Sequence, residues 1–184
     1  MKLHLLRHTR PDVPEGICYG QSDVDVAGSF GQELEKVRGL IGQIDYTQVY
    51  CSPLQRCVKL ARGIGIGTAG MKLDERLMEM HFGNWEMKKW GDIEQGPEAR
   101  GWFADYMRSR VPEGESYRDL QERVRDFIRD LQVSPDKGEK LIICHKGIIL
   151  AFMALTDPAA DEAELFRKEI AYGALITLEL KRFL

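Results

Sequence analysis

Short apolar runs alternate along the chain with spaced apolar residues, and this pattern predicts alternating strands and helices. Short runs rich in apolar residues predict strands at residues 2–6, 48–51, 141–144 and 174–180. The run at 141–144 is fully apolar, which is typical of a strand buried on both faces. Apolar residues three or four positions apart mark one face of a helix, and they predict helices at residues 28–44, 117–131 and 147–155. This order favours an α/β fold with a mostly parallel sheet covered on both sides.

Polar residues mark the starts of two helices. Ser52 and Pro53 predict a helix that runs to about Ile64, because serine can cap free N–H groups and proline at the first position gives up no hydrogen bond. Ser116 and Asp119 have the spacing of a capping box at the start of a later helix.

Residues 88–113 have little periodicity but are rich in aromatic side chains. We expect a single domain over residues 1–184, with this segment as a cap insertion that covers a site. Its aromatic residues are Trp90, Trp102, Phe103 and Tyr106.

Composition and charge narrow the class of protein. The chain has 184 residues, of which 43% are hydrophobic and 30% charged, as in an ordinary globular domain. No stretch approaches the ~20 apolar residues of a membrane-spanning helix, and the N-terminal residues lack the long apolar region of a signal peptide, so the expected location is the cytoplasm. A net charge of −3 gives no basic field for nucleic acid, which favours a small-molecule substrate. The oligomeric state stays open.

The spacing of cysteine and histidine argues against a metal site. No two cysteines form a C-x-x-C pair, so we expect reduced side chains packed in the interior: Cys18, Cys51, Cys57 and Cys144. No two of the four histidines form an H-x-x-x-H or H-E-x-x-H pair of the kind that holds zinc on a helix. We therefore expect neither a metal nor another cofactor.

Basic residues occur at the ends of predicted strands and at a predicted helix start. Arg7 and His8 end the first strand, Arg56 lies near the start of the second helix, and His145 ends the buried strand. Taken singly, each has an ordinary explanation as a surface pair, a helix start or a hydrogen-bonded core histidine. Because strand ends meet at one edge of a parallel sheet, the set together predicts a phosphate site in which arginines pair with phosphate oxygens.

Five short motifs, which follow one another in order along the chain, resemble those of the histidine phosphatase superfamily, which includes the cofactor-dependent phosphoglycerate mutases. They are Leu6-Arg7-His8-Thr9, Ser52-Pro53-Leu54-Gln55-Arg56, Leu77-x-Glu79-x-x-Phe82-Gly83-x-Trp85-Glu86, Gly114-Glu115-Ser116 and Cys144-His145-x-Gly147. The resemblance implies a three-layer α/β/α sandwich of the phosphoglycerate mutase type. It also implies that His8 is the nucleophile, that Glu79 is the proton donor, and that Arg7, Arg56 and His145 form the phosphate pocket.

Elementary chemistry agrees with these implied roles. His8 must be neutral to attack phosphorus, and neighbouring arginines lower its pKa. His145 should be cationic once a phosphate dianion is bound. Glu79 would protonate the leaving oxygen and then activate water, although only the motif separates it from the nearby Glu75 and Glu86.

The chain departs from the common pattern of the superfamily at several positions. Thr9 stands where many relatives have glycine, and residues 11–14 offer no match to an asparagine that contacts substrate in relatives. Lys146 and Met87 each replace a glycine of the common motifs. Lys146 could add a charge near the phosphate or simply be solvated.

Within the superfamily, residues 13–23 look most like the alpha-ribazole phosphatases of cobalamin assembly. This resemblance implies alpha-ribazole 5′-phosphate as the substrate. The aromatic residues of the insertion would either supply a stacking surface for its base or simply fill the core of a small cap. The substrate contacts would be Tyr19, Gly20, Gln21 and Lys146.

Three other functions remain open. The first is mutase-type phosphoryl transfer, for which the chain is short. The second is hydrolysis of phosphate esters with broad specificity. The third is a noncatalytic module that binds a phosphorylated ligand, but such a module would need neither a nucleophile nor a proton donor.

Overall fold

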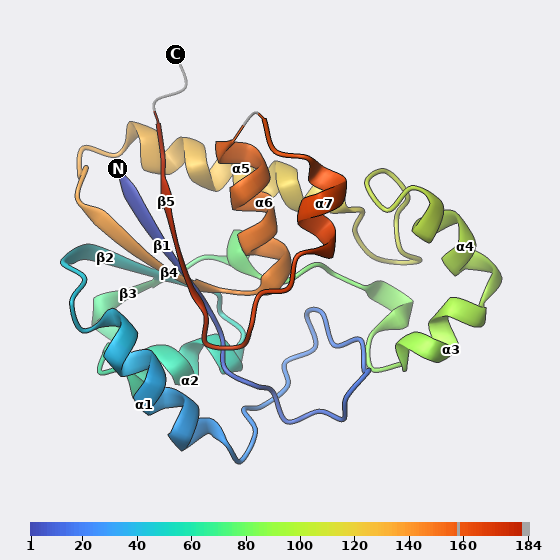
Figure 1. Ribbon diagram of the computed structural model, residues 1–184, viewed down its shortest axis with the longest axis horizontal. Helices are drawn as coiled ribbons and strands as arrows, with labels where there is room; N and C mark the ends of the chain where they lie inside the picture. Colours follow the sequence, from blue (N-terminus) through green and yellow to red (C-terminus); the bar gives the residue numbers. More distant parts are fainter. Residues whose placement is uncertain (158, 182–184) are drawn as a thin grey trace.

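A five-stranded sheet forms the centre of the protein, as a computed structural model that describes residues 1–157 and 159–181 shows (Figure 1). Neighbouring strands follow the order β3-β2-β4-β1-β5. The strands are β1 (Lys2–Arg7), β2 (Tyr46–Cys51), β3 (Met71–Leu73), β4 (Glu139–Cys144) and β5 (Leu175–Glu179). All pairings are parallel except that of β5 with β1. The sheet is therefore mostly parallel, as the sequence predicts.

Helices cover both faces of the sheet (Figure 1). On one face lie α1 (Phe30–Ile41) and α2 (Gln55–Gly63), and on the other lie α5 (Tyr117–Val133) and α6 (Lys146–Thr156). The expected three-layer α/β/α sandwich is thereby confirmed.

The buried strand β4 shows why a continuous apolar run is diagnostic. Leu141 and Ile143 pack into the hydrophobic cluster of α1 and α2, whereas Ile142 and Cys144 pack into the cluster of α5 and α6. Successive side chains of a strand point to opposite faces, so a strand with a helical layer on each side has no polar face.

The remaining elements are short, and the sequence pattern missed most of them. Two helices within the predicted insertion, α3 (Trp90–Gln95) and α4 (Pro97–Ala104), lie beside the layers at the right of Figure 1. A third helix, α7 (Glu162–Arg167), precedes β5. Three 3-10 helices complete the order: η1 (Thr68–Gly70), η2 (Glu75–Leu77) and η3 (Gly83–Trp85). The edge strand β3 and helix α7 had no counterpart among the predicted elements.

Two predicted helix boundaries were wrong. The prediction that Ser52 caps the second helix fails, because α2 begins only at Gln55. The Ser52 hydroxyl instead accepts a hydrogen bond of 2.8 Å from Nε2 of His145. The first helix is shorter than residues 28–44, because it ends at Ile41 and Gly42 closes its last turn by donating to the carbonyl of Arg38.

The capping box and the cysteines agree with prediction. Ser116 accepts from the backbone of Asp119, and the Asp119 carboxylate accepts from the backbone of Ser116. The four cysteines are free and buried.

Within residues 1–157 and 159–181, no group of three or more His, Cys, Asp or Glu side chains is arranged to hold a metal ion. In the same ranges, no helix is both long and apolar enough to cross a membrane.

Candidate active site

Three adjacent parallel strands end at the same side of the sheet, and candidate site residues follow each of them. His8 follows β1, His145 follows the central strand β4, and Ser52 follows β2. The imidazole rings of His8 and His145 lie 5.0 Å apart between centroids. Arg56 in α2 approaches the same point, with Nη2 3.3 Å from Nδ1 of His145. The basic groups that are distant in sequence therefore form a single cluster.

The orientation of His8 leaves one ring nitrogen with a free lone pair. Its Nδ1 lies 2.7 Å from the carbonyl oxygen of Thr9. Because a carbonyl can only accept, Nδ1 carries the hydrogen and Nε2 keeps its lone pair. Burial lowers the pKa of His8 well below its ordinary value, and the charges of Arg56 and Arg7 lower this pKa further. The neutral imidazole that nucleophilic attack requires is thus favoured by its surroundings.

The two arginines carry positive charge into the buried site. Arg56 is 0% exposed, and it donates to the carbonyls of Ser22 at 2.9 Å and Gly20 at 2.7 Å. Arg7 donates to the carbonyl of Ile170. Of the side chains in the described residues, Arg7 and Arg56 are among the few with a buried polar atom that lacks a hydrogen-bond partner, in each case Nε. Two such donors beside His8 suit the oxygens of a phosphate group.

His145 is also held neutral by the protein's own groups. A guanidinium can only donate, so the Arg56 contact leaves the hydrogen of the neutral ring on Nε2, which donates to Ser52. Burial lowers the pKa of His145 well below its ordinary value, and Arg56 and His8 lower it further. The cationic His145 expected from the sequence therefore depends on the charge that a bound phosphate dianion would add.

Glu79 lies at the N-terminus of α6. Its Oε2 accepts from the backbone N–H of Gly147 at 3.1 Å, and its Oε1 accepts from Met80 at 3.0 Å. Of the two competing glutamates, Glu75 is exposed, whereas Glu86 is bonded to the loop at residues 20–22. Of the three glutamates, Glu79 is therefore the best candidate for a proton donor, and it is also the one that the motif singles out.

The predicted substrate contacts in residues 19–21 touch the charged groups of the site. The carbonyl of Gly20 accepts from Arg56, and the amide of Gln21 donates to the carbonyl of Glu79 at 2.9 Å. Gly20 has φ of +32°, and a Cβ there would lie 2.6 Å from Oε1 of Glu86. Glycine is required at this position because a side chain would collide with the neighbouring segment.

A residue that the sequence analysis missed, Tyr172, completes the surroundings of His8. Its ring lies 5.6 Å from the His8 ring, and the Arg7 guanidinium carbon lies 4.0 Å from the ring centroid. Its hydroxyl is 3.1 Å from that of Tyr19, whose ring stands edge-on to His8. Tyr172 is far from every motif along the chain, so nothing local in the sequence identifies it.

Comparison with known proteins decides the family. The model of the histidine phosphatase superfamily (branch 1) matches residues 3–182 of this chain. The chain belongs to the histidine phosphatase superfamily. The predicted phosphoglycerate mutase-like fold and the predicted class of enzyme are thereby confirmed.

Relatives in this superfamily carry different substrate names. The chain is 28% identical over 167 residues to the adenosylcobalamin/alpha-ribazole phosphatase of Salmonella typhimurium, covering 88% of this chain and 83% of that protein. It is 32% identical over 161 residues to a protein of Hydrogenobacter thermophilus provisionally named phosphoserine phosphatase 2, covering 84% and 77% respectively. The crystal structure of the alpha-ribazole phosphatase from Shigella flexneri has the same fold, with a TM-score of 0.86 at 21% identity over 99% of this chain and 92% of that one.

A cavity of about 350 Å³ adjoins Glu79 in this superfamily member. Most of its wall is aromatic or aliphatic, and its charged lining residues are Glu79, Glu94 and Lys146. The aromatic lining residues are Phe82, Trp90, Trp102, Phe103, Tyr117 and Phe166.

Three of the four aromatic residues that the sequence analysis chose in the insertion line this cavity. Tyr106 does not line it and instead stacks on Phe166, with the ring centroids 3.9 Å apart. Phe166 belongs to α7, so a helix that the pattern missed supplies part of the wall. Glu79 lines this cavity and His8 does not.

Proposed function

We propose that this protein hydrolyses alpha-ribazole 5′-phosphate by way of a phosphohistidine on His8. The observation that carries the proposal is the aromatic cavity beside Glu79. A flat, apolar benzimidazole base would fit such a wall, and stacking of a base on an aromatic side chain contributes roughly 1–3 kcal/mol. Residues 88–113 would act as the cap that encloses this base within a single domain.

In the first step, Nε2 of His8 attacks phosphorus while Arg7, Arg56 and His145 hold the other phosphate oxygens. The new N–P bond forms as the bond from phosphorus to the ester oxygen breaks. Glu79, in its protonated form, gives its proton to the departing oxygen, so that the nucleoside leaves as a neutral alcohol. The cationic groups stabilise the charge that spreads over the equatorial oxygens.

In the second step, the Glu79 carboxylate takes a proton from water, and the water oxygen attacks the phosphohistidine. The N–P bond breaks, inorganic phosphate leaves, and His8 returns to its neutral form. The hydrogen bond from Nδ1 of His8 to the Thr9 carbonyl keeps the ring in one orientation through both steps.

Four residues would help to bind the rest of the substrate, two by contact and two through the loop that they form. Tyr19 stands beside His8, and Lys146 lines the cavity. Gly20 and Gln21 would act through the loop that they form between Arg56 and Glu79. Hydrolysis of this ester would give the protein a role in assembly of the cobalamin nucleotide loop.

One observation favours a second candidate, phosphoserine. Glu94 and Lys146 place opposite charges in the same cavity, and these could pair with the ammonium and carboxylate groups of that amino acid. The rest of the wall is apolar and cannot pair with the charges of such a small zwitterion. Because burying those charges away from water is costly, this cavity suits phosphoserine less well.

A comparison of specificity constants tests the proposal. We expect kcat/KM for alpha-ribazole 5′-phosphate to exceed that for ribose 5-phosphate, L-phosphoserine and 3-phosphoglycerate by at least about a hundredfold, or ~2.7 kcal/mol. A preference for phosphoserine would select the second candidate. Phosphoryl transfer between the hydroxyls of glycerate would establish a mutase, and similar rates on all esters would indicate broad specificity. Phosphate release from none of them would leave a binding module.

A further inference from the structure

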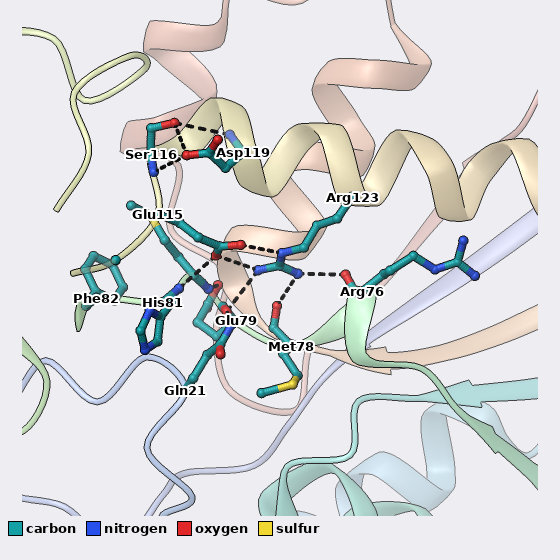
Figure 2. A network of polar contacts seen from close by, with 12 residues as sticks. Gln21, Arg76, Met78, Glu79, His81, Phe82, Glu115, Ser116, Asp119 and Arg123 are labelled. Carbon is teal, nitrogen blue, oxygen red and sulfur yellow. Dashed lines mark hydrogen bonds and ion pairs between the residues drawn. The ribbon is translucent and has the colours of Figure 1, made fainter. Parts of the chain in front are cut away.

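The motif Gly114-Glu115-Ser116 contains a glutamate to which the mechanism above gives no role. Glu115 forms an ion pair with Arg123 of α5, with Nε to Oε1 at 2.9 Å and Nη2 to Oε2 at 3.0 Å. Figure 2 shows this pair next to the segment that carries Glu79. We infer that Glu115 and Arg123 are positioning residues that fix the backbone on both sides of Glu79, and this inference rests on the proposed role of Glu79 as the proton donor.

Arg123 uses every hydrogen-bond donor of its guanidinium. Besides the two bonds to Glu115, Nη1 donates to the carbonyls of Arg76 and Met78, each at 2.7 Å. Nη2 also donates to the carbonyl of Glu79 itself at 3.0 Å (Figure 2). A guanidinium has five N–H groups in a planar fork, and all five are engaged here. A lysine has three donors on one nitrogen and cannot reproduce this set.

Glu115 holds the chain on the other side of Glu79. Its Oε2 accepts from the backbone N–H of His81 at 2.9 Å, and its own N–H donates to the carbonyl of His81 at 2.9 Å. Residues 78–82 lie between η2 and η3, outside the helices and strands. The ion pair therefore provides, for this segment, the hydrogen bonds that regular secondary structure would otherwise provide.

The pair lies close enough to the site for a small movement to matter. The side chains of Arg123 and Glu115 are only 17% and 19% exposed, so their bonds are largely shielded from water. The carboxyl of Glu79 in turn depends on backbone donors at Met80 and Gly147 for its own orientation. A shift of the backbone by about 1 Å would misplace a catalytic group enough to cost on the order of a hundredfold in rate.

A purely structural role for the pair makes a different prediction. If Arg123 only attached η2 to α5, its loss would lower stability and affect all substrates alike. If it positions a general acid, its loss should matter most where the leaving group needs a proton. Glycerol 2-phosphate has such an alkoxide leaving group, whereas the phenolate of p-nitrophenyl phosphate departs without help.

The test compares both esters across Arg123→Met, Arg123→Lys, Glu115→Gln and Glu79→Gln. We expect Arg123→Met to lower kcat on glycerol 2-phosphate by about thirtyfold or more and on p-nitrophenyl phosphate by less than about threefold. Arg123→Lys and Glu115→Gln should show the same selective loss in a smaller degree. In a Glu79→Gln background, Arg123→Met should change kcat on glycerol 2-phosphate by less than about twofold, because it acts through Glu79.

Asp130→Asn provides the matched control. It removes a 2.7 Å ion pair between Arg76 and Asp130, which also links η2 to α5 but leaves the carbonyls held by Arg123 untouched. We expect unchanged ratios between the two esters for this variant.

Three outcomes would overturn one part or another of this inference. Equal losses on both esters in the Arg123 and Glu115 variants, or full additivity with Glu79→Gln, would overturn the positioning role. Equal losses in Glu79→Gln itself would instead overturn the assignment of the proton donor. If Arg123→Met does not fold, the two milder variants decide the question, and a thermal melt of each confirms that it is folded.

Discussion

Glu79 occupies the space that a side chain at position 147 would need. The Gly147 N–H donates to Oε2 of Glu79 at 3.1 Å, and a Cβ on Gly147 would lie 2.3 Å from Oε1. The glycine at the second position of α6 therefore allows the carboxylate to approach the helix N-terminus. The glycine of the His145-x-Gly147 motif is therefore explained by its contact with a residue on another segment.

Gly147→Ala should reduce activity without unfolding the protein. The group that must move is the end of a flexible side chain, and alanine is favoured over glycine in a helix by roughly 0.5–1 kcal/mol, so stability should stay near that of the wild type. We expect kcat on glycerol 2-phosphate to fall at least about tenfold, and on p-nitrophenyl phosphate much less. Gly39→Ala in α1, where a Cβ meets nothing within 4 Å, is the control and should leave both rates unchanged. Unaltered kinetics in Gly147→Ala would show that the carboxylate position is not critical.

Met87→Gly should stabilise the protein. Met87 has φ of +61°, a left-handed conformation that costs an ordinary residue about 1–2 kcal/mol, and the residue is 52% exposed. Glycine also loses more conformational entropy on folding, which offsets part of the strain that it relieves. We therefore expect a net gain of about 0.5–1 kcal/mol in the free energy of unfolding. Urea denaturation measures this gain, and Met87→Ala should not produce it. A loss of stability in Met87→Gly would mean that the methionine side chain contributes more than its exposure suggests.

The two buried imidazoles should make stability fall in mild acid. Both His8 and His145 have folded-state pKa values below the ordinary 6.5. Below pH 6.5 the unfolded chain therefore binds protons that the native protein does not, and stability decreases as the pH falls toward the folded-state pKa values. Between pH 7.5 and 5.5, we expect the wild type to lose more free energy of unfolding than the variant with both His8→Gln and His145→Gln. An equal loss in the two proteins would contradict the lowered pKa values.

The layers of the fold were predictable from the sequence because burial leaves a strong pattern. β4 lies between two helical layers, so every side chain in residues 141–144 is apolar. The capping box at Ser116 was equally plain, because both partners are local. β3 has three residues, of which only Met71 is buried, and so short a segment carries too little pattern to recognise. The predicted cap at Ser52 failed because α2 begins only at Gln55, and the local pattern gave no sign that the Ser52 hydroxyl contacts His145, which is distant in sequence.

The residues of the candidate site likewise fall into two groups, those that a local sequence motif identifies and those that only contacts between distant segments identify. His8, Arg56, Glu79 and His145 belong to short motifs, and the order of strands brings the two histidines together. Tyr172 and Arg123 could not be identified, because their contacts join segments far apart along the chain. Arg123 lies among charged neighbours on an amphipathic helix, where a solvated arginine would have the same sequence context. Cys57, although 3.6 Å from Nε2 of His145, is buried and burial raises its pKa to about 12.

Trapping of the covalent intermediate tests the central claim most directly. The protein is mixed briefly with p-nitrophenyl phosphate, quenched in alkali, and digested for mass spectrometry. The account predicts one phosphoryl group on the peptide that contains His8, stable in base and labile in acid, and no such group in His8→Ala, whose turnover should fall by several orders of magnitude. A phosphoryl group on another residue, or a His8→Ala variant that keeps more than about a hundredth of wild-type turnover, would contradict the phosphohistidine mechanism.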